Sequence, residues 1–224
     1  MARYFYALDI DERGRHDLAA LQARILPSLP KPTPPKNLHL TLAFLGQATD
    51  EQLTAINQVA ATFAPPKANL SAEETATNSQ IQSPKPRPNI QPQPLTLTVD
   101  HLAIFQTAKV LYAGLQITPH WLAALAKQLI NAALGQGIKI PEREFIPHIT
   151  LSRKVSQLSF GESKVESKIE DKVKGEVEGK KEINSVLIPP IVLTISSFSL
   201  YLSKSTANGV DYQVIERFNI SKPL

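Results

Sequence analysis

The chain has 224 residues, of which 42% are hydrophobic, and a formal net charge of +4. This length is sufficient for one substantial core or two small lobes. The sequence contains no cysteine, which excludes a disulfide framework, a thiolate nucleophile and a cysteine-ligated zinc site. No apolar run approaches the roughly 20 residues of a membrane span, and the N-terminus lacks the apolar segment of a signal peptide. We therefore expect a cytoplasmic protein that does not enter a membrane.

The first part of the chain alternates between strand and helix patterns. Residues 3–10 predict a strand, and residues 11–25 carry leucines at helical spacing. Residues 29–35 contain four prolines and predict a loop before a strand over 38–46. Thr49 or Asp50 is the expected N-cap of a helix that ends near Phe63.

The second part repeats this alternation. Residues 95–105 and 109–117 predict a hairpin, and residues 121–134 predict a helix for which Thr118 is a plausible N-cap. The further strands expected from apolar runs and from a turn at Asn208-Gly209 cover residues 145–153, 191–202 and 211–218.

Two segments lack the pattern of a packed element. Residues 65–94 are rich in Pro, Ser, Asn, Gln and Thr. Residues 154–182 contain seven lysines and seven acidic residues, and a further proline pair lies at 189–190. We interpret 65–94 and 154–190 as flexible insertions in a single domain that spans residues 1–224.

The most informative feature is a tetrapeptide that occurs twice, as His39-Leu40-Thr41-Leu42 and as His148-Ile149-Thr150-Leu151. On a strand, residues i and i+2 point to the same face. His39 and Thr41 therefore share one face, and the apolar residues between and beyond them share the other. The same holds for His148 and Thr150. The near-repeat of a helix and such a strand in each half predicts two similar lobes related by a pseudo-twofold axis, with one motif from each lobe at a central cleft.

This set of side chains is typical of acid/base cleavage of a phosphodiester. One imidazole can deprotonate water while the other protonates the leaving oxygen. The threonine hydroxyls can donate hydrogen bonds to phosphate oxygens. No metal or other cofactor is required. The residues themselves do not decide which histidine is the acid.

Longer segments around both motifs resemble the 2H phosphoesterase superfamily, and within it the RNA 2′,3′-cyclic phosphodiesterase branch, also called the 2′-5′ RNA ligase family. The similarity includes segments at the start and end of the chain as well as the motifs. These segments are residues 3–8, 37–46, 143–153 and 198–203.

The resemblance implies an α+β fold that is bilobal, with two antiparallel sheets, helices on the outside and a V-shaped cleft. It also implies hydrolysis of RNA 2′,3′-cyclic phosphate ends to a 2′-phosphate. By the same resemblance, His39 is the general acid for the leaving 3′-oxygen and His148 is the general base, while Thr41 and Thr150 hold the phosphate. The expected partners are RNA ends, including tRNA fragments, or cyclic nucleotides, and the expected state is a monomer.

Two further residues are candidate substrate contacts. Arg153 can bind phosphate, or it can pair with a nearby carboxylate such as Glu142 or Glu144. Tyr112 occupies a position where the family usually has an aromatic residue, and it either packs in the fold or meets a base.

Other residues receive a structural interpretation. We expect Phe44 and Phe145 in the core and His16 in solvent. His101 has no threonine two positions later, and His120 begins a helix, so neither is assigned to the site.

Two other functions are compatible with the motifs. The reverse reaction joins a 2′,3′-cyclic end to a 5′-hydroxyl as a 2′-5′ RNA ligase, and it uses the same acid/base pair. A non-catalytic nucleotide- or RNA-binding module is the other alternative, although both motifs are intact.

Overall fold

The computed structural model describes residues 2–25, 29–65, 95–156, 185–207 and 209–220. The two predicted insertions lie largely outside the described residues. The α-helices of the described chain are α1 (Glu12–Ile25), α2 (Asp50–Ala61) and α3 (His120–Gly135), and η1 (Pro35–Asn37) is a 3-10 helix. The strands are β1 (Arg3–Leu8), β2 (Lys31–Pro32), β3 (Leu40–Gly46), β4 (Leu95–Phe105), β5 (Val110–Gly114), β6 (His148–Arg153), β7 (Ser185–Ile195), β8 (Ser197–Thr206) and β9 (Gly209–Asn219).

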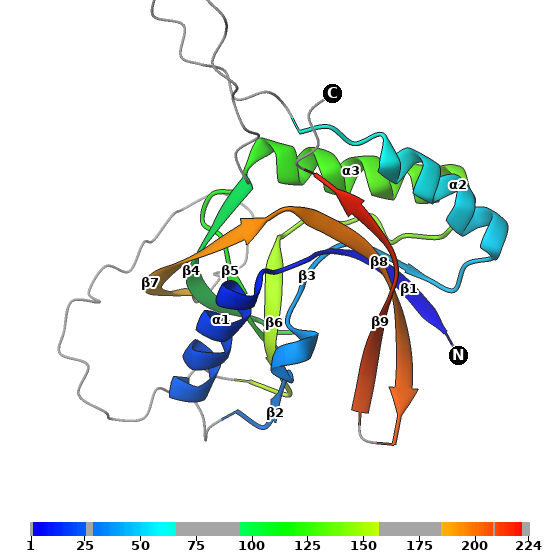
Figure 1. Cartoon of the computed structure of the whole chain (residues 1–224). Helices are drawn as coiled ribbons and strands as arrows, with labels where there is room; N and C mark the ends of the chain where they lie inside the picture. Colours follow the sequence, from blue (N-terminus) through cyan, green and yellow to red (C-terminus); the bar gives the residue numbers. More distant parts are fainter. Residues whose placement is uncertain (1, 26–28, 66–94, 157–184, 208, 221–224) are drawn as a thin grey trace, which may run out of the picture.

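These strands form one open, antiparallel sheet in the order β7-β4-β5-β6-β3-β1-β8-β9, with β2 paired to β6 (Figure 1). The predicted α+β class with antiparallel pairing is confirmed. The two expected sheets are continuous, because β3 and β6 are joined through the residue pair Leu40↔Ile149. The other neighbours along the main path pair over five residues or more, so this junction divides the sheet into two four-stranded halves.

The helices connect the two halves. α1 follows β1 in the chain but packs against β7, in the other half. α3 follows β5 but packs against β3, again in the other half, and α2 lies beside α3 (Figure 1). This reciprocal arrangement is what a pseudo-twofold relation between the halves predicts. None of the described helices is long and apolar enough to cross a membrane.

Several predicted elements agree with the structure. The hairpin β4–β5 and the helices α1, α2 and α3 occur where the sequence pattern places them. Thr49 is the N-cap of α2 and forms a capping box with Gln52. The hairpin β8–β9 turns at Gly209, whose φ of 126° favours glycine.

Three expectations were wrong. The single strand predicted over 191–202 is two strands, β7 and β8, which lie in different halves of the sheet, and β7 begins at Ser185 within the predicted insertion. Apolar periodicity continues through Ser196 and so hides this break. Lys31 and Pro32 form the short strand β2 instead of a loop, because a strand pair at an edge tolerates proline. The N-cap of α3 is Pro119 and not Thr118.

Candidate active site

The two His-x-Thr motifs meet at the junction between the halves of the sheet. Leu40 and Ile149 are paired across β3 and β6, and both are fully buried in the core. Directly opposite residues on antiparallel strands share a face. By alternation from the pair Leu40↔Ile149, the motif residues on either side of it lie on the other face of the sheet. All four side chains lie on the face opposite the buried pair, and all four are half-buried.

Both histidines are held in the same way. The Nδ1–H of His39 donates to the carbonyl oxygen of Asn37 over 2.7 Å. The Nδ1–H of His148 donates to the carbonyl oxygen of Ile146, also over 2.7 Å. A carbonyl oxygen only accepts, so Nδ1 carries the proton in each ring and Nε2 remains for a ligand. In each imidazole, Nδ1 is thus fixed by a backbone hydrogen bond, and Nε2 is the nitrogen that can exchange a proton with a ligand.

A register shift in the β5–β6 pairing brings Arg153 to the same face. Thr150 pairs with Tyr112, but Ser152 pairs with Leu111, so Leu151 is an extra residue in β6. Arg153 pairs with Val110, which lies on the same face of β5 as Tyr112. Arg153 therefore lies on the face of the sheet that carries His148. Simple alternation from His148, without the bulge, would place Arg153 on the opposite face.

The same irregularity occurs in β3 and overturns the prediction that Phe44 is a core residue. Thr41 pairs with Ala7 and Ala43 pairs with Tyr6, so Leu42 is an extra residue. Phe44 pairs with Phe5, on the same face of β1 as Ala7. The side chain of Phe44 is 44% exposed, on the face that carries Thr41. Phe44 follows His39 by five residues, as Arg153 follows His148.

Aromatic rings surround His39. The ring centroid of Phe5 lies 5.0 Å from that of His39, and the ring of Tyr212 meets it edge-on at 5.0 Å. Tyr201 stacks on Phe5 and lies 6.5 Å from His39. The start of β9 is tied to the segment before β3, because Lys36 pairs with Asp211 and the Asn37 side-chain amide donates to the carbonyl of Val210. The pairing of distant strands, which no local pattern signals, brings Tyr212 to the site.

Aromatic rings also surround His148. Phe105 meets the His148 ring edge-on at 4.9 Å, and Tyr112 meets it at 5.5 Å. Phe105 stacks on Tyr112 with a centroid distance of 4.2 Å. Tyr112 is only 2% exposed, so it packs against His148 and has little surface for a base. Phe145 packs against the core as predicted.

The environment lowers the pKa of both imidazoles. Burial, together with the nearby charges of His148 and Arg153, lowers the pKa of His39 to about 4, against the opposing effect of its hydrogen bond to Asn37. Burial also lowers the pKa of His148, and the cationic Arg143 and Arg153 add to this effect, while the hydrogen bond to Ile146 opposes it. A site that disfavours two cationic imidazoles and contains Arg153 is suited to an anionic ligand.

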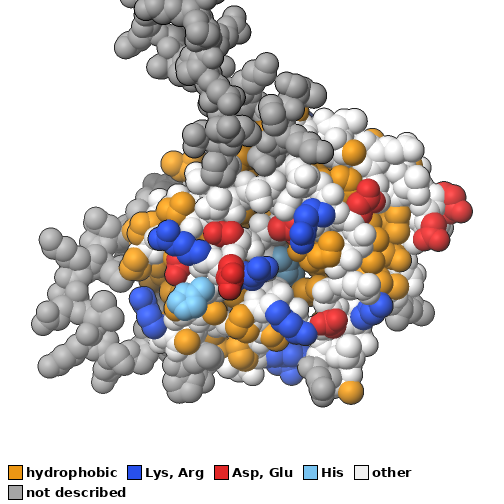
Figure 2. Space-filling view, viewed as in Figure 1, with side chains coloured by type: hydrophobic (Ala, Val, Ile, Leu, Met, Phe, Trp, Pro, Cys, Tyr) orange, Lys and Arg blue, Asp and Glu red, His pale blue; other side chains and the backbone are white. Residues whose placement is uncertain are grey.

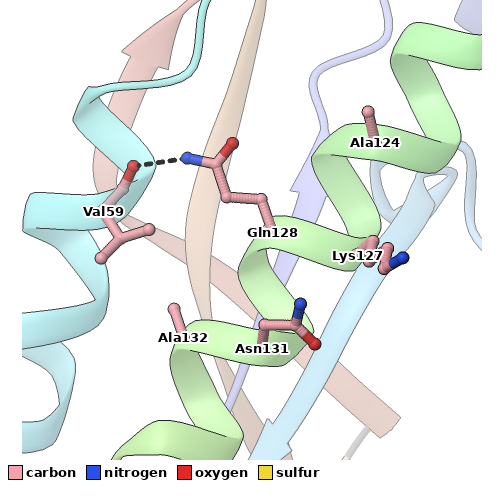
Figure 3. A pocket seen from close by; sticks show the side chains of 6 residues that line it. All are labelled: Val59, Ala124, Lys127, Gln128, Asn131 and Ala132. Atoms are coloured by element: carbon pink, nitrogen blue, oxygen red, sulfur yellow. Dashed lines mark hydrogen bonds between the residues drawn. The ribbon is translucent and has the colours of Figure 1, made fainter.

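Figure 2 shows one face of the molecule, coloured by side-chain type. A histidine side chain lies recessed near the centre of the face in Figure 2, and Lys, Arg, Asp and Glu side chains surround it. A separate hollow lies between α2 and α3, where the Gln128 side-chain amide donates to the Val59 carbonyl over 3.0 Å (Figure 3). No residue of the His-x-Thr motifs lines it.

In the described part of the chain, no group of three His, Cys, Asp or Glu residues could hold a metal ion.

Comparisons with known proteins agree with the fold. Residues 8–89 match the family model of LigT like Phosphoesterase. The RNA 2′,3′-cyclic phosphodiesterase of Escherichia coli is 29% identical over 69% of this chain and 73% of its own length. By its sequence, the chain is thus similar to the LigT-like phosphoesterase family. An RNA 2′,3′-cyclic phosphodiesterase of Thermus thermophilus is 27% identical over 97% of this chain and 90% of its own length.

The fold of the chain is also that of solved structures. E. coli LigT complexed with 3′-AMP superposes with a TM-score of 0.67 and 24% identity, and the match covers 98% of each chain. The chain therefore has the same fold as E. coli LigT.

Proposed function

We propose that the chain hydrolyses RNA 2′,3′-cyclic phosphate ends to 2′-phosphates, with two histidines and no metal. The observation that carries this proposal is the junction Leu40↔Ile149, which brings His39, Thr41, His148 and Thr150 to one face. Two relatives that align with most of the chain are named RNA 2′,3′-cyclic phosphodiesterase, which supports the substrate class.

In this mechanism, Nε2 of His148 accepts a proton from water as the water attacks phosphorus. Nε2 of His39 donates a proton to the departing 3′-oxygen, so the phosphate remains on O2′. In-line displacement requires the attacking and leaving oxygens on opposite sides of phosphorus. Imidazoles on two different strands, each with its Nδ1 edge already fixed by a carbonyl, can serve these two sides.

The remaining phosphate oxygens would be held by neutral and cationic donors. The hydroxyls of Thr41 and Thr150 lie on the same face as the imidazoles, and Arg153 supplies a positive charge that acts on both histidines. Phe44 adds an exposed ring on this face, which is the property needed to stack on a base. Tyr112, which is buried, would support His148 by packing.

The test uses an RNA oligomer that ends in a 2′,3′-cyclic phosphate. We expect the wild-type protein to convert it to a 2′-phosphate in the presence of EDTA. The product should resist an enzyme that removes only 3′-phosphates. His39→Ala and His148→Ala are the site variants, and His16→Ala is the matched control, because the side chain of His16 is 82% exposed on α1. An intact cyclic end after incubation with folded wild-type protein would refute the proposal.

A further inference from the structure

A third histidine lies on the face of the sheet that carries His148. Gly114 of β5 pairs with His148 of β6 on one side and with His101 of β4 on the other. Directly opposite residues of neighbouring strands point to the same face, so these three positions form one row across the sheet. His101 is therefore two strands from His148, with only a glycine between them.

The imidazole of His101 occupies the space over this glycine. A Cβ atom built on Gly114 would lie 2.6 Å from Nε2 and 2.7 Å from Cε1 of His101, which is closer than real atoms approach. The same Cβ would lie 3.1 Å from Cε2 of Tyr112. The absence of a side chain at this position thus lets the His101 ring extend across β5 toward β6.

Asp100 fixes the orientation of this ring. The Nδ1–H of His101 donates to Oδ1 of Asp100 over 3.0 Å, and the backbone N–H of Gln116 donates to the same oxygen over 2.9 Å. The β4–β7 register shifts between Val99 and His101, and this irregularity brackets Asp100. The extra residues of this shift lie in β7, because only Asp100 separates Val99 from His101 on β4. The side chain of His101 is only 14% exposed.

Tyr112 connects this pair to the site. Its ring meets the His101 ring edge-on with a centroid distance of 6.2 Å and meets the His148 ring at 5.5 Å. Phe105 covers one face of Tyr112. The position of the Tyr112 ring, and with it one wall of the His148 environment, thus depends on where His101 lies.

We propose that His101, oriented by Asp100, is a positioning residue that holds Tyr112 against His148. It acts through Tyr112, and it keeps His148 in the dry, fixed position from which an imidazole accepts a proton. This inference rests on the proposed function for its kinetic consequence, but its structural consequence can be measured without any substrate.

The groups that face these rings define the expected direction of change. The charges of Arg143 and Arg153 lower the pKa of His148. Asp100 accepts a hydrogen bond from His101, and the β7 residue opposite His101 is the apolar Leu187. Burial is the largest cause of the lowered pKa of His148. Removal of the His101 ring admits water beside Tyr112, so the pKa of His148 should rise toward its ordinary value.

The experiment measures His148 by NMR titration and hydrolysis of a cyclic-phosphate RNA oligomer in parallel. In His101→Ala and Gly114→Ala, we expect the pKa of His148 to rise, kcat to fall roughly tenfold and KM to stay within about twofold. Asp100→Ala should resemble them, and Asp100→Asn should retain most activity because its amide oxygen still accepts from Nδ1–H. His16→Ala is the control and should match the wild type.

Two results would overturn the inference. If the His148 titration in folded Gly114→Ala and His101→Ala equals that of the wild type, His101 does not position it. If KM rises while kcat is unchanged, His101 contacts the substrate directly. Gly114→Ala keeps both Asp100 and His101, so it tests the inference even if His101→Ala does not fold. A wild-type protein inactive on the RNA would refute the proposed function instead, and the NMR titration would still decide the role of His101.

Discussion

The lowered pKa of His39 leads to a prediction about anion binding. With a pKa of about 4, only about one His39 in a thousand is protonated at pH 7 in the free protein. A general acid needs that proton when the leaving oxygen departs. In the proposed mechanism, the negative charge of the bound phosphate therefore has to raise the pKa of His39.

The magnitude follows from Coulomb's law. A unit negative charge about 4 Å from the imidazolium, at an effective dielectric constant of about 20, contributes about 4 kcal/mol. At 1.36 kcal/mol per pKa unit this is about three units, which moves the pKa of His39 from about 4 to near 7. Anion binding and protonation are linked, so the anion should also bind more tightly as the pH falls through this interval.

NMR titration of the histidine rings tests this, with sulfate as an anion whose charge is constant over the range. Spectra of His39→Gln and His148→Gln would assign the two signals, and exposed His16 is the internal control. We expect the His39 signal to titrate near pH 4 without sulfate and at least two units higher at saturation. A His39 pKa that stays near 4 while other site signals report bound sulfate would refute the coupling, and with it the role of His39 as acid.

Other perturbations of the site have defined outcomes. His39→Ala and His148→Ala should each reduce kcat/KM by roughly 10²–10⁴-fold, and EDTA should not affect the wild type; an EDTA loss restored by a divalent cation would contradict this. Arg153→Met should raise the pKa of both histidines, so the acid limb of the kcat/KM profile should move to higher pH; an unmoved limb would argue against its electrostatic role. Phe44→Ala should raise KM for RNA and change kcat little, whereas an unchanged KM would exclude base stacking. Between pH 6.5 and 4, His39 becomes protonated in the unfolded chain but stays neutral in the folded protein, so the folded state loses stability as the pH falls. Denaturant titrations over this interval should therefore show that the free energy of unfolding falls by up to about 3 kcal/mol more in the wild type than in His39→Gln. Equal losses in the two proteins would contradict the lowered pKa.

The sequence was most informative where function depends on local pattern. Two copies of His-x-Thr-Leu, each in an apolar strand, place a histidine and a threonine on one face by alternation alone, and the structure brings both pairs together at Leu40↔Ile149. Capping by Thr49 was likewise readable from local chemistry.

What the sequence did not predict depends on pairing between distant strands. The bulges at Leu42 and Leu151 are visible only from the register with β1 and β5, and they move Phe44 and Arg153 to the histidine face. The contact of Tyr212 with His39 depends on the place of β9 in the sheet. The sequence pattern offered no reason to assign His101 to the site, because it has no threonine two positions later. Its position over Gly114 depends on the pairing of β4 with β5.

The near-symmetry of the site bears on how the two histidines can differ. Both donate Nδ1–H to the carbonyl two residues earlier, and both pack against aromatic rings, so neither the tautomer nor the hydrogen bonding separates acid from base. The difference lies five residues later, where one half of the sheet presents the ring of Phe44 and the other the guanidinium of Arg153. An asymmetric ligand such as a nucleoside cyclic phosphate can therefore bind with its base toward one half and its charge toward the other. In the proposed mechanism, the orientation of the substrate, and not an intrinsic property of either imidazole, then determines which histidine lies beside the leaving oxygen.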